Sequence, residues 1–249
     1  MAHIHLDHVS LEFPVYGAGK RAVKKELVRI ATGGMLKSEP HGIVTVKALD
    51  QLSLEITNGM RLGLIGHNGA GKSTLLRLIS GIYEPTGGSL TVEGHVTPLL
   101  NMMIAFDESS TGYEIIKIRG LLQGLTPKEI EKRTQEIVDF SELGDYLEMP
   151  LRTYSDGMRM RLAFGILASC TPEILVLDEI FGAGDGHFLV KAKKRMEEMI
   201  DTSSIVIFTS HQMELIREIC THVLWLDAGK PLFFGNVDEG LALYKATLT

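Results

Sequence analysis

The chain has 249 residues, of which 45% are hydrophobic and 22% are charged, so we expect one folded domain and not a disordered, collagen-like or coiled-coil chain. Its 25 basic and 31 acidic residues give a formal net charge of −6, which argues against a dedicated nucleic-acid binder. Two cysteines are too few for a disulfide framework, and neither a signal peptide nor a membrane-spanning run of roughly 20 apolar residues is expected.

The N-terminal third contains predicted strands and a basic helix. Apolar residues partly alternate over residues 3–13, which predicts a strand. Over residues 20–31, Val23, Leu27 and Ile30 recur at helical spacing among lysines and arginines, which predicts a basic amphipathic helix. Its charged face is either solvated or a contact for an anionic headgroup. The following predicted segments are a turn-rich loop, two strands and a helix, at residues 37–42, 44–56, 61–66 and 72–82.

The rest of the chain is first helical and then alternating. Residues 101–171 have a mostly helical pattern, in which Thr126, Pro127 and Glu129 mark a helix start. Strand and helix patterns then alternate, which predicts an α/β fold with a mostly parallel sheet covered on both faces. These later strands and helices are predicted at residues 174–178, 188–200, 204–209, 211–219, 222–227 and 237–247.

Residues 66–74, GHNGAGKST, match the phosphate-binding pattern G-x-x-x-x-G-K-[ST] between a predicted buried strand and a predicted helix. Glycines let several backbone N–H groups converge on phosphate oxygens, and the helix N-terminus adds a favourable dipole. We expect Lys72 to reach the β- and γ-phosphates and the Ser73 hydroxyl to ligate Mg²⁺. The nucleotide-binding residues predicted here are Gly66, Asn68, Gly69, Ala70, Gly71, Lys72, Ser73 and Thr74.

Two acids follow the apolar run at residues 174–177. Because open α/β sheets bind ligands at the carboxyl ends of their strands, Asp178 suits a metal and Glu179 suits a general base that polarises the attacking water. The next predicted strand is followed by His211. A lone histidine is more often structural, but this strand is expected beside the one that carries Asp178, which makes His211 a catalytic candidate.

The segment Tyr154–Met158, YSDGM, precedes a predicted helix shortly before the two acids. With the motifs above, in this order, it resembles the signature motif of the ATP-binding domains of ABC transporters, over essentially the whole chain. The resemblance implies a single P-loop NTPase domain over 1–249, with a mostly parallel sheet, an antiparallel β subdomain and a helical signature subdomain at about 108–170. It also implies a head-to-tail homodimer that sandwiches two ATP·Mg²⁺, in which Ser155 and Gly157 of one chain clamp the γ-phosphate bound by the other.

The same resemblance implies three further features of the site. Asp185 would lie in the loop that crosses the dimer interface. Phe13 or Tyr16, near the end of the first strand, would stack on adenine, and either could instead be a core residue. The stretch that carries a glutamine in the family has Asp107 and Glu108 here and no glutamine.

The sequence YSDGMRMRLAF is similar to the YSSGM-x-x-RLAF form of ATPases that export lipid-linked O-antigen, teichoic acid or capsule, and the basic helix at 20–31 is typical of the O-antigen type. This implies a peripheral ATPase on the cytoplasmic side of the plasma membrane, bound to a dimeric integral membrane permease near Met102, Met103 and Phe106. The cargo would be a polysaccharide on a lipid diphosphate. An importer ATPase or a soluble ABC protein is the alternative. We expect a form without the C-terminal carbohydrate-binding domain that O-antigen exporters often carry.

Overall fold

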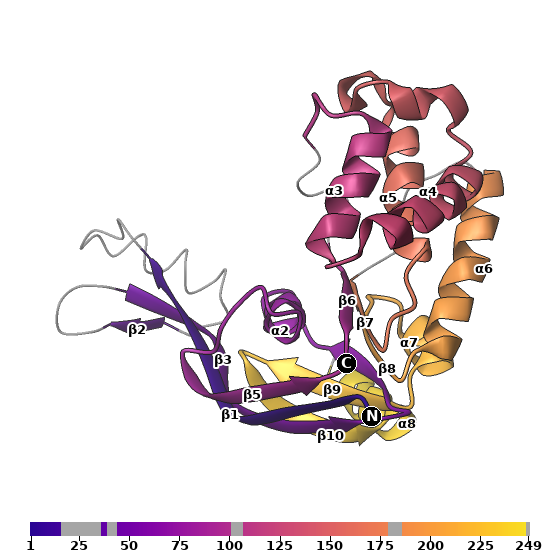
Figure 1. Cartoon of the computed structure of the whole chain (residues 1–249). Coiled ribbons are helices and arrows are strands. Elements are labelled where there is room, and N and C mark those ends of the chain that lie inside the picture. Colours follow the sequence, from indigo (N-terminus) through magenta and orange to yellow (C-terminus); the bar gives the residue numbers. More distant parts are fainter. Residues whose placement is uncertain (16–35, 39–43, 101–106, 179–185, 248–249) are drawn as a thin grey trace. The chain divides into compact units, whose positions relative to one another are not determined.

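The computed structural model describes two compact units of one chain (Figure 1). The sheet unit comprises Met1–Leu100, Glu173–Glu179 and Ser203–Thr249, and the helical unit comprises Asn101–Pro172 and Ile180–Thr202. The basic helix predicted at 20–31 lies outside the described residues, as do Met102, Met103 and Phe106. The described residues are 1–15, 36–38, 44–100, 107–178 and 186–247.

An antiparallel sheet forms one layer of the sheet unit. Strand β1 (His3–Val15) lies between β3 (Val44–Thr57) and β5 (Gly87–Glu93), and β2 (Leu36–Ser38) pairs with the other edge of β3. The sequence predicted β1 and β3 to within two residues. It missed β5, and it placed a loop at 37–42 where β2 lies.

The second sheet of this unit is mostly parallel. Its described strands run in the order β10-β9-β4-β8-β7-β6, and β10 is antiparallel to its neighbour β9 while the other pairs are parallel. The apolar runs of β7 and β8 are buried, as a strand covered on both faces requires. The strands are β4 (Arg61–Ile65), β6 (Val96–Leu99), β7 (Ile174–Asp178), β8 (Ile205–Thr209), β9 (His222–Asp227) and β10 (Lys230–Asn236).

These two sheets confirm the predicted fold class, a mostly parallel sheet with a separate antiparallel layer. Strands β6 and β10 were not predicted. β6 is four residues long and contains Pro98, which an edge strand tolerates because one of its sides needs no ladder hydrogen bond. A four-residue segment that contains a proline is too short to show the period-2 pattern on which a strand prediction depends.

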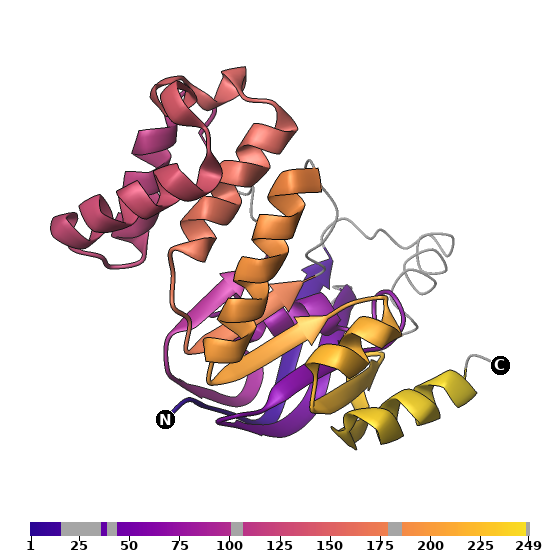
Figure 2. The same ribbon diagram turned by 90° about the vertical axis from the view of Figure 1, so that its right-hand side faces the viewer.

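Three helices belong to the sheet unit: α2 (Lys72–Ile79), α7 (Met213–Ile219) and α8 (Val237–Ala246). Helix α2 packs on β3 and on β7, so its buried leucines share one core with both sheets. It ends three residues earlier than predicted, where Gly81 adopts a φ of 70°. Helix α8 packs on β9 and β10 and against α7 (Figure 2).

The helical unit is built from α3 (Gly112–Leu122), α4 (Pro127–Ser141), α5 (Asp156–Ala168) and α6 (Gly186–Thr202), with 3₁₀ turns at Gly144–Glu148 and Leu151–Thr153. Helices α3 and α4 each begin with a capping box, formed by Thr111 with Glu114 and by Thr126 with Glu129. None of the described helices combines the length and the apolar character needed to cross a bilayer.

Two basic side chains of α6 hold the ends of its neighbours. The Lys191 ammonium donates to the backbone oxygen of Phe140 (3.0 Å) and pairs with Glu142 (2.6 Å) at the end of α4. The Arg195 guanidinium donates through Nε to the backbone oxygen of Ala168, the last residue of α5 (2.8 Å). Cations at helix C-termini are favourable because of the helix dipole, so α6 fixes the ends of α4 and α5. The Lys191 ammonium also holds the pKa of Glu142 below its usual value.

The packing of β8 can be tested at Phe208. Its side chain is 1% exposed, and its strand pairs with β7 and β4. We expect Phe208→Ala to lower the free energy of unfolding by about 3–5 kcal/mol, because the removed ring leaves a cavity. Denaturant unfolding measures this. Ile82→Ala is the control, because Ile82 is 55% exposed in the same unit and its loss is expected to change stability by less than about 0.5 kcal/mol.

Candidate nucleotide site

Residues 66–74, here called the phosphate loop, run from the end of β4 into the first turn of α2, and two of their glycines are required by their surroundings. Gly66 has a φ of 141°, and a Cβ there would lie 2.2 Å from the backbone oxygen of Leu226 on β9. Gly71 has a φ of 109°, and its Cβ would lie 2.7 Å from the backbone oxygen of Ala48 on β3. A larger residue at either position would therefore displace the loop or the strand behind it.

The phosphate loop presents donors to one place. Helix α2 has no side-chain cap and no acid in its first turn, so the N–H groups of that turn suit an anion. The Lys72 ammonium donates to the backbone oxygens of Gly66 (2.7 Å) and His67 (3.0 Å). The lysine therefore lies back across the loop, at the start of the helix.

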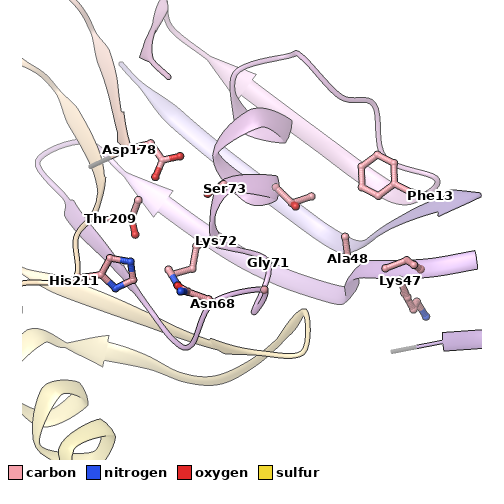
Figure 3. A pocket seen from close by; sticks show the side chains of 13 residues that line it. Phe13, Lys47, Ala48, Asn68, Gly71, Lys72, Ser73, Asp178, Thr209 and His211 are labelled. Atoms are coloured by element: carbon pink, nitrogen blue, oxygen red, sulfur yellow. The ribbon is translucent and has the colours of Figure 1, made fainter. Parts of the chain in front are cut away.

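A pocket of the sheet unit runs along this loop (Figure 3). Phe13 and Lys47 lie at one end, the phosphate loop in the middle, and Asp178 and His211 at the other end. The arrangement suits an elongated ligand with an aromatic end and an anionic end. The lining residues are Phe13, Val46, Lys47, Ala48, Asn68, Gly69, Gly71, Lys72, Ser73, Thr74, Asp178, Thr209 and His211.

Strand order brings Asp178 and His211 together. Strands β7 and β8 are parallel neighbours, with Asp178 opposite Thr209, so the carboxyl ends of both strands open on the pocket. The expectation that the strand before His211 lies beside the strand of Asp178 is confirmed. His211 precedes α7, which begins two residues later than the sequence predicted. Glu179, the predicted general base, lies outside the described residues.

Of the other predicted binding residues, one lines the pocket, one is buried within the loop, and two are not described by the structure. Phe13 lines the pocket and also packs edge-to-face on Tyr83, with ring centroids 5.2 Å apart. Ala70 is a fully buried residue of the loop, and its backbone oxygen accepts from Gly229 N (2.9 Å). Tyr16 and Asp185 lie outside the described residues.

Four residues that line the pocket were not predicted from the sequence: Val46, Lys47, Ala48 and Thr209. The first three come from β3, whose Val46 pairs with Phe13 on β1. Alternation along one strand cannot show which strand it pairs with, so the sequence carried no signal for them. Thr209 follows the apolar run of β8 directly and lies two residues before His211. Its place at the end of a predicted strand was the only sequence signal that it could line a ligand site.

The signature segment, residues 154–158, lies at the start of α5 in the helical unit. The Ser155 hydroxyl caps the helix, since its Oγ accepts from Met158 N (3.3 Å). The buried Tyr154 anchors the segment by donating its hydroxyl to the backbone oxygen of Tyr146 (2.6 Å). A Cβ on Gly157 would have Ser155 Oγ, 3.9 Å away, as its nearest neighbour. Local packing therefore does not explain why this residue is glycine.

The two acids in place of the family's glutamine are both engaged within the helical unit. The Asp107 carboxylate accepts from Ser109 N (3.1 Å) and from the hydroxyls of Ser109 and Ser110, which lower its pKa. Glu108 pairs with Arg159 of α5 (3.1 Å). Asp107 thus stabilises the turn that precedes α3, and Glu108 attaches this turn to α5.

Comparison with known proteins gave a match to the ABC transporter family model over residues 49–182. The O-antigen export system ATP-binding protein RfbE of Yersinia enterocolitica is 42% identical over 92% of this chain and 96% of its own length. The teichoic acids export ATP-binding protein TagH of Staphylococcus saprophyticus is 36% identical over 98% of this chain and 89% of its own. The O-antigen export protein RfbB of Myxococcus xanthus is 37% identical over 91% of this chain and 51% of its own.

Solved structures share the fold. An ATP-binding subunit of an ABC transporter aligns with a TM-score of 0.69 and 19% identity, over 97% of this chain and 93% of its own. A dimeric ATP-binding cassette, solved in a post-hydrolysis state with ADP and Pi, aligns with a TM-score of 0.67 and 16% identity, over 94% and 98%.

A substitution of Lys72 tests whether the phosphate loop binds ATP. We expect Lys72→Ala to weaken ATP binding by about 10–100-fold, because a hydrogen bond to a charged group contributes about 1.5–3 kcal/mol. Isothermal titration with ATP measures this. Lys193→Ala, which removes an exposed lysine of α6, is the matched control and should bind ATP like the wild type. Equal ATP affinity of both variants would contradict the assignment of the phosphate loop.

Proposed function

Because the chain belongs to the family of ABC transporter ATP-binding subunits and is an ATPase, we propose that it powers the export of O-antigen, a lipid-linked polysaccharide, through a separate membrane permease. The observation that carries the cargo class is the 42% identity with RfbE of Yersinia enterocolitica over nearly the full length of both chains. TagH of Staphylococcus saprophyticus, at 36%, makes teichoic acid the second candidate. Both cargoes belong to the same class, a polymer exported on a lipid carrier.

The pocket supports the binding of ATP with its adenine toward Phe13 and its γ-phosphate toward Asp178 and His211. In this orientation the Lys72 ammonium exchanges its two loop carbonyls for β- and γ-phosphate oxygens. His211 then lies at the γ-phosphate end. Phe13 stacks on the base in this proposal, although its contact with Tyr83 also serves the core.

The pocket also fits Mg²⁺. Ser73 and Asp178 line the same pocket with a hydroxyl and a carboxylate, the hard oxygen donors that this ion prefers. Bound there, Mg²⁺ would neutralise charge on the β- and γ-phosphates. The base in this proposal is Glu179, which follows Asp178 directly in the chain and would polarise the attacking water.

We place the signature segment of a second copy against the γ-phosphate. Three features of α5 support this role: a helix N-terminus with a favourable dipole, the Ser155 hydroxyl, and the clearance around Gly157. Asp185 would lie where the two copies cross. ATP binding would then close a head-to-tail homodimer, and hydrolysis would open it, on the cytoplasmic side of the membrane.

The export proposal is tested in cells that lack the chromosomal copy of this gene. Wild type should restore surface polysaccharide and should fractionate with membranes only when the permease is co-expressed. Glu179→Gln should bind ATP, stay trapped as a closed dimer and restore no export, because the loss of a general base slows hydrolysis by about 10²–10⁴-fold. Unchanged turnover in this variant would remove Glu179 as the base. Fractionation that ignores the permease would contradict the transport role.

A substitution at Ser155 can distinguish its role as a helix cap from its proposed role in binding the γ-phosphate. We expect Ser155→Asp to keep the free energy of unfolding of the wild type within about 0.5 kcal/mol, because aspartate is an equally good N-cap. The same change should abolish ATP-driven dimerisation, since a carboxylate would face the γ-phosphate of the other copy. Ultracentrifugation with ATP, in an otherwise Glu179→Gln chain, measures the dimer. Intact dimerisation would exclude this contact.

A further inference from the structure

The ring of Tyr83 packs on the ring of Phe13, at the end of the pocket where the base of ATP would lie. The two rings meet edge-to-face, with centroids 5.2 Å apart and planes inclined by 70°. Both side chains are partly buried and pack on the core of the sheet unit. Phe13 is among the described residues that line the pocket and Tyr83 is not, so Tyr83 supports the Phe13 ring from outside the pocket (Figure 3).

The segment that carries Tyr83, residues 80–86, is fixed at its start to the end of α2. Ile82 N donates to the backbone oxygen of Arg77 (2.9 Å), so the chain stays in contact with the last turn of the helix. Gly81 makes the turn possible with a left-handed φ of 70°. Tyr83 follows Ile82 directly, and its position is therefore set relative to the helix that leaves the phosphate loop.

The same segment is fixed at its other end to β1, close to Phe13. The Thr86 hydroxyl donates to the backbone oxygen of Ser10 (3.1 Å) and accepts from Glu12 N (3.1 Å). Thr86 N donates to the same oxygen of Ser10 (2.8 Å). Glu12 precedes Phe13 directly in the chain. Three hydrogen bonds thus hold the segment against β1, and Tyr83 lies between the two attachments.

An edge-to-face contact limits the orientations that the Phe13 ring can adopt. Two aromatic rings attract each other in this geometry because the positive edge of one meets the negative face of the other. The contact occupies an edge or one face of Phe13, so a face remains for a base to stack on. A ring that is already held in one orientation loses less freedom when a base stacks on it, which favours binding. Val46, the residue opposite Phe13 on β3, is aliphatic and has no such directional preference.

We propose that Tyr83 is a positioning residue for the nucleotide base: its ring holds the Phe13 ring in the orientation that stacks on adenine. This role rests on the proposed function, in which Phe13 stacks on the base. Tyr83 does not touch ATP and acts through another side chain. Its effect therefore falls on the affinity for ligands that carry a base and spares the phosphate contacts.

The experiment compares the binding of two ligands, ATP and inorganic tripolyphosphate, by isothermal titration. Tripolyphosphate has the phosphate chain of ATP without the base. We expect Tyr83→Leu, which keeps an apolar side chain but removes the ring, to weaken ATP binding about 3–10-fold and to leave tripolyphosphate binding unchanged. Tyr83→Phe keeps the ring and should bind both ligands like the wild type.

Tyr244→Leu is the matched control, because Tyr244 makes the same type of contact elsewhere in the sheet unit. Its ring packs on Trp225 with centroids 5.4 Å apart and an angle of 69° between the planes, and neither residue is among those that line the pocket. Thermal unfolding measures what each change costs in stability and confirms that each variant is folded. The control should bind ATP like the wild type, even where both leucine variants unfold at a lower temperature.

A double variant shows whether Tyr83 acts through Phe13. Phe13→Ala removes the stacking ring and should weaken ATP binding about 5–100-fold, while tripolyphosphate binds as before. Because Tyr83 supplies only the orientation of Phe13 in this proposal, adding Tyr83→Leu to Phe13→Ala should weaken ATP binding no further.

Three results would overturn the proposal: wild-type ATP affinity in Tyr83→Leu, equal weakening of ATP and tripolyphosphate in this variant, or additive losses in the double variant. Equal weakening would indicate a displaced α2, and additive losses would mean that Tyr83 acts independently of Phe13. Unchanged ATP binding in Phe13→Ala would instead exclude Phe13 as the base contact of the proposed function, and the role of Tyr83 with it.

Discussion

The candidate nucleotide site depends on one constraint, the contact of Gly66 and Gly71 in the phosphate loop with the backbones of the strands behind them. Gly66 leaves no room for a Cβ against Leu226 O, and Gly71 leaves little against Ala48 O. The loop is therefore bounded by β9 at Gly66 and by β3 at Gly71. The strain of positive φ angles at Gly66, Gly69 and Gly71 is small because glycine lacks a side chain. A phosphate site of this kind is shaped by the whole sheet unit and not by its nine residues alone.

The two ends of the pocket follow from the pairing of strands. The antiparallel sheet contributes Phe13 and Lys47 through the β1–β3 pair, and the parallel sheet contributes Asp178 and Thr209 through the β7–β8 pair. Helix α2, packed on β3 and β7, places Lys72 and Ser73 between them. Phe13, the phosphate loop and the polar ends of β7 and β8 thus follow one another along the pocket, which matches the order of base, phosphates and metal in the ATP·Mg²⁺ that we propose to bind there.

The main feature of the helical unit is the set of polar contacts that fix helix α5 at its two ends. Ser155 caps α5 at its beginning, and Arg195 of α6 holds the carbonyl of Ala168 at its end. Lys191 ties α4 to the same helix α6 through Phe140 and Glu142. Both ends of α5 are thereby held by polar contacts, so a ligand at the signature segment would meet a preorganised helix terminus.

The sequence by itself determined the motifs, their order and the alternation of strands and helices. It predicted β7, β8 and the start of α2 closely, because their buried apolar runs and the glycine pattern are local signals. It also led to the family, which the comparisons confirm. Only the tertiary structure decided which strands pair, and therefore that Lys47 lines the pocket and that Tyr83, shortly before β5, meets Phe13 on β1. Strand pairing joins distant segments through backbone hydrogen bonds that every residue type can form, so a linear pattern carries no record of the partner.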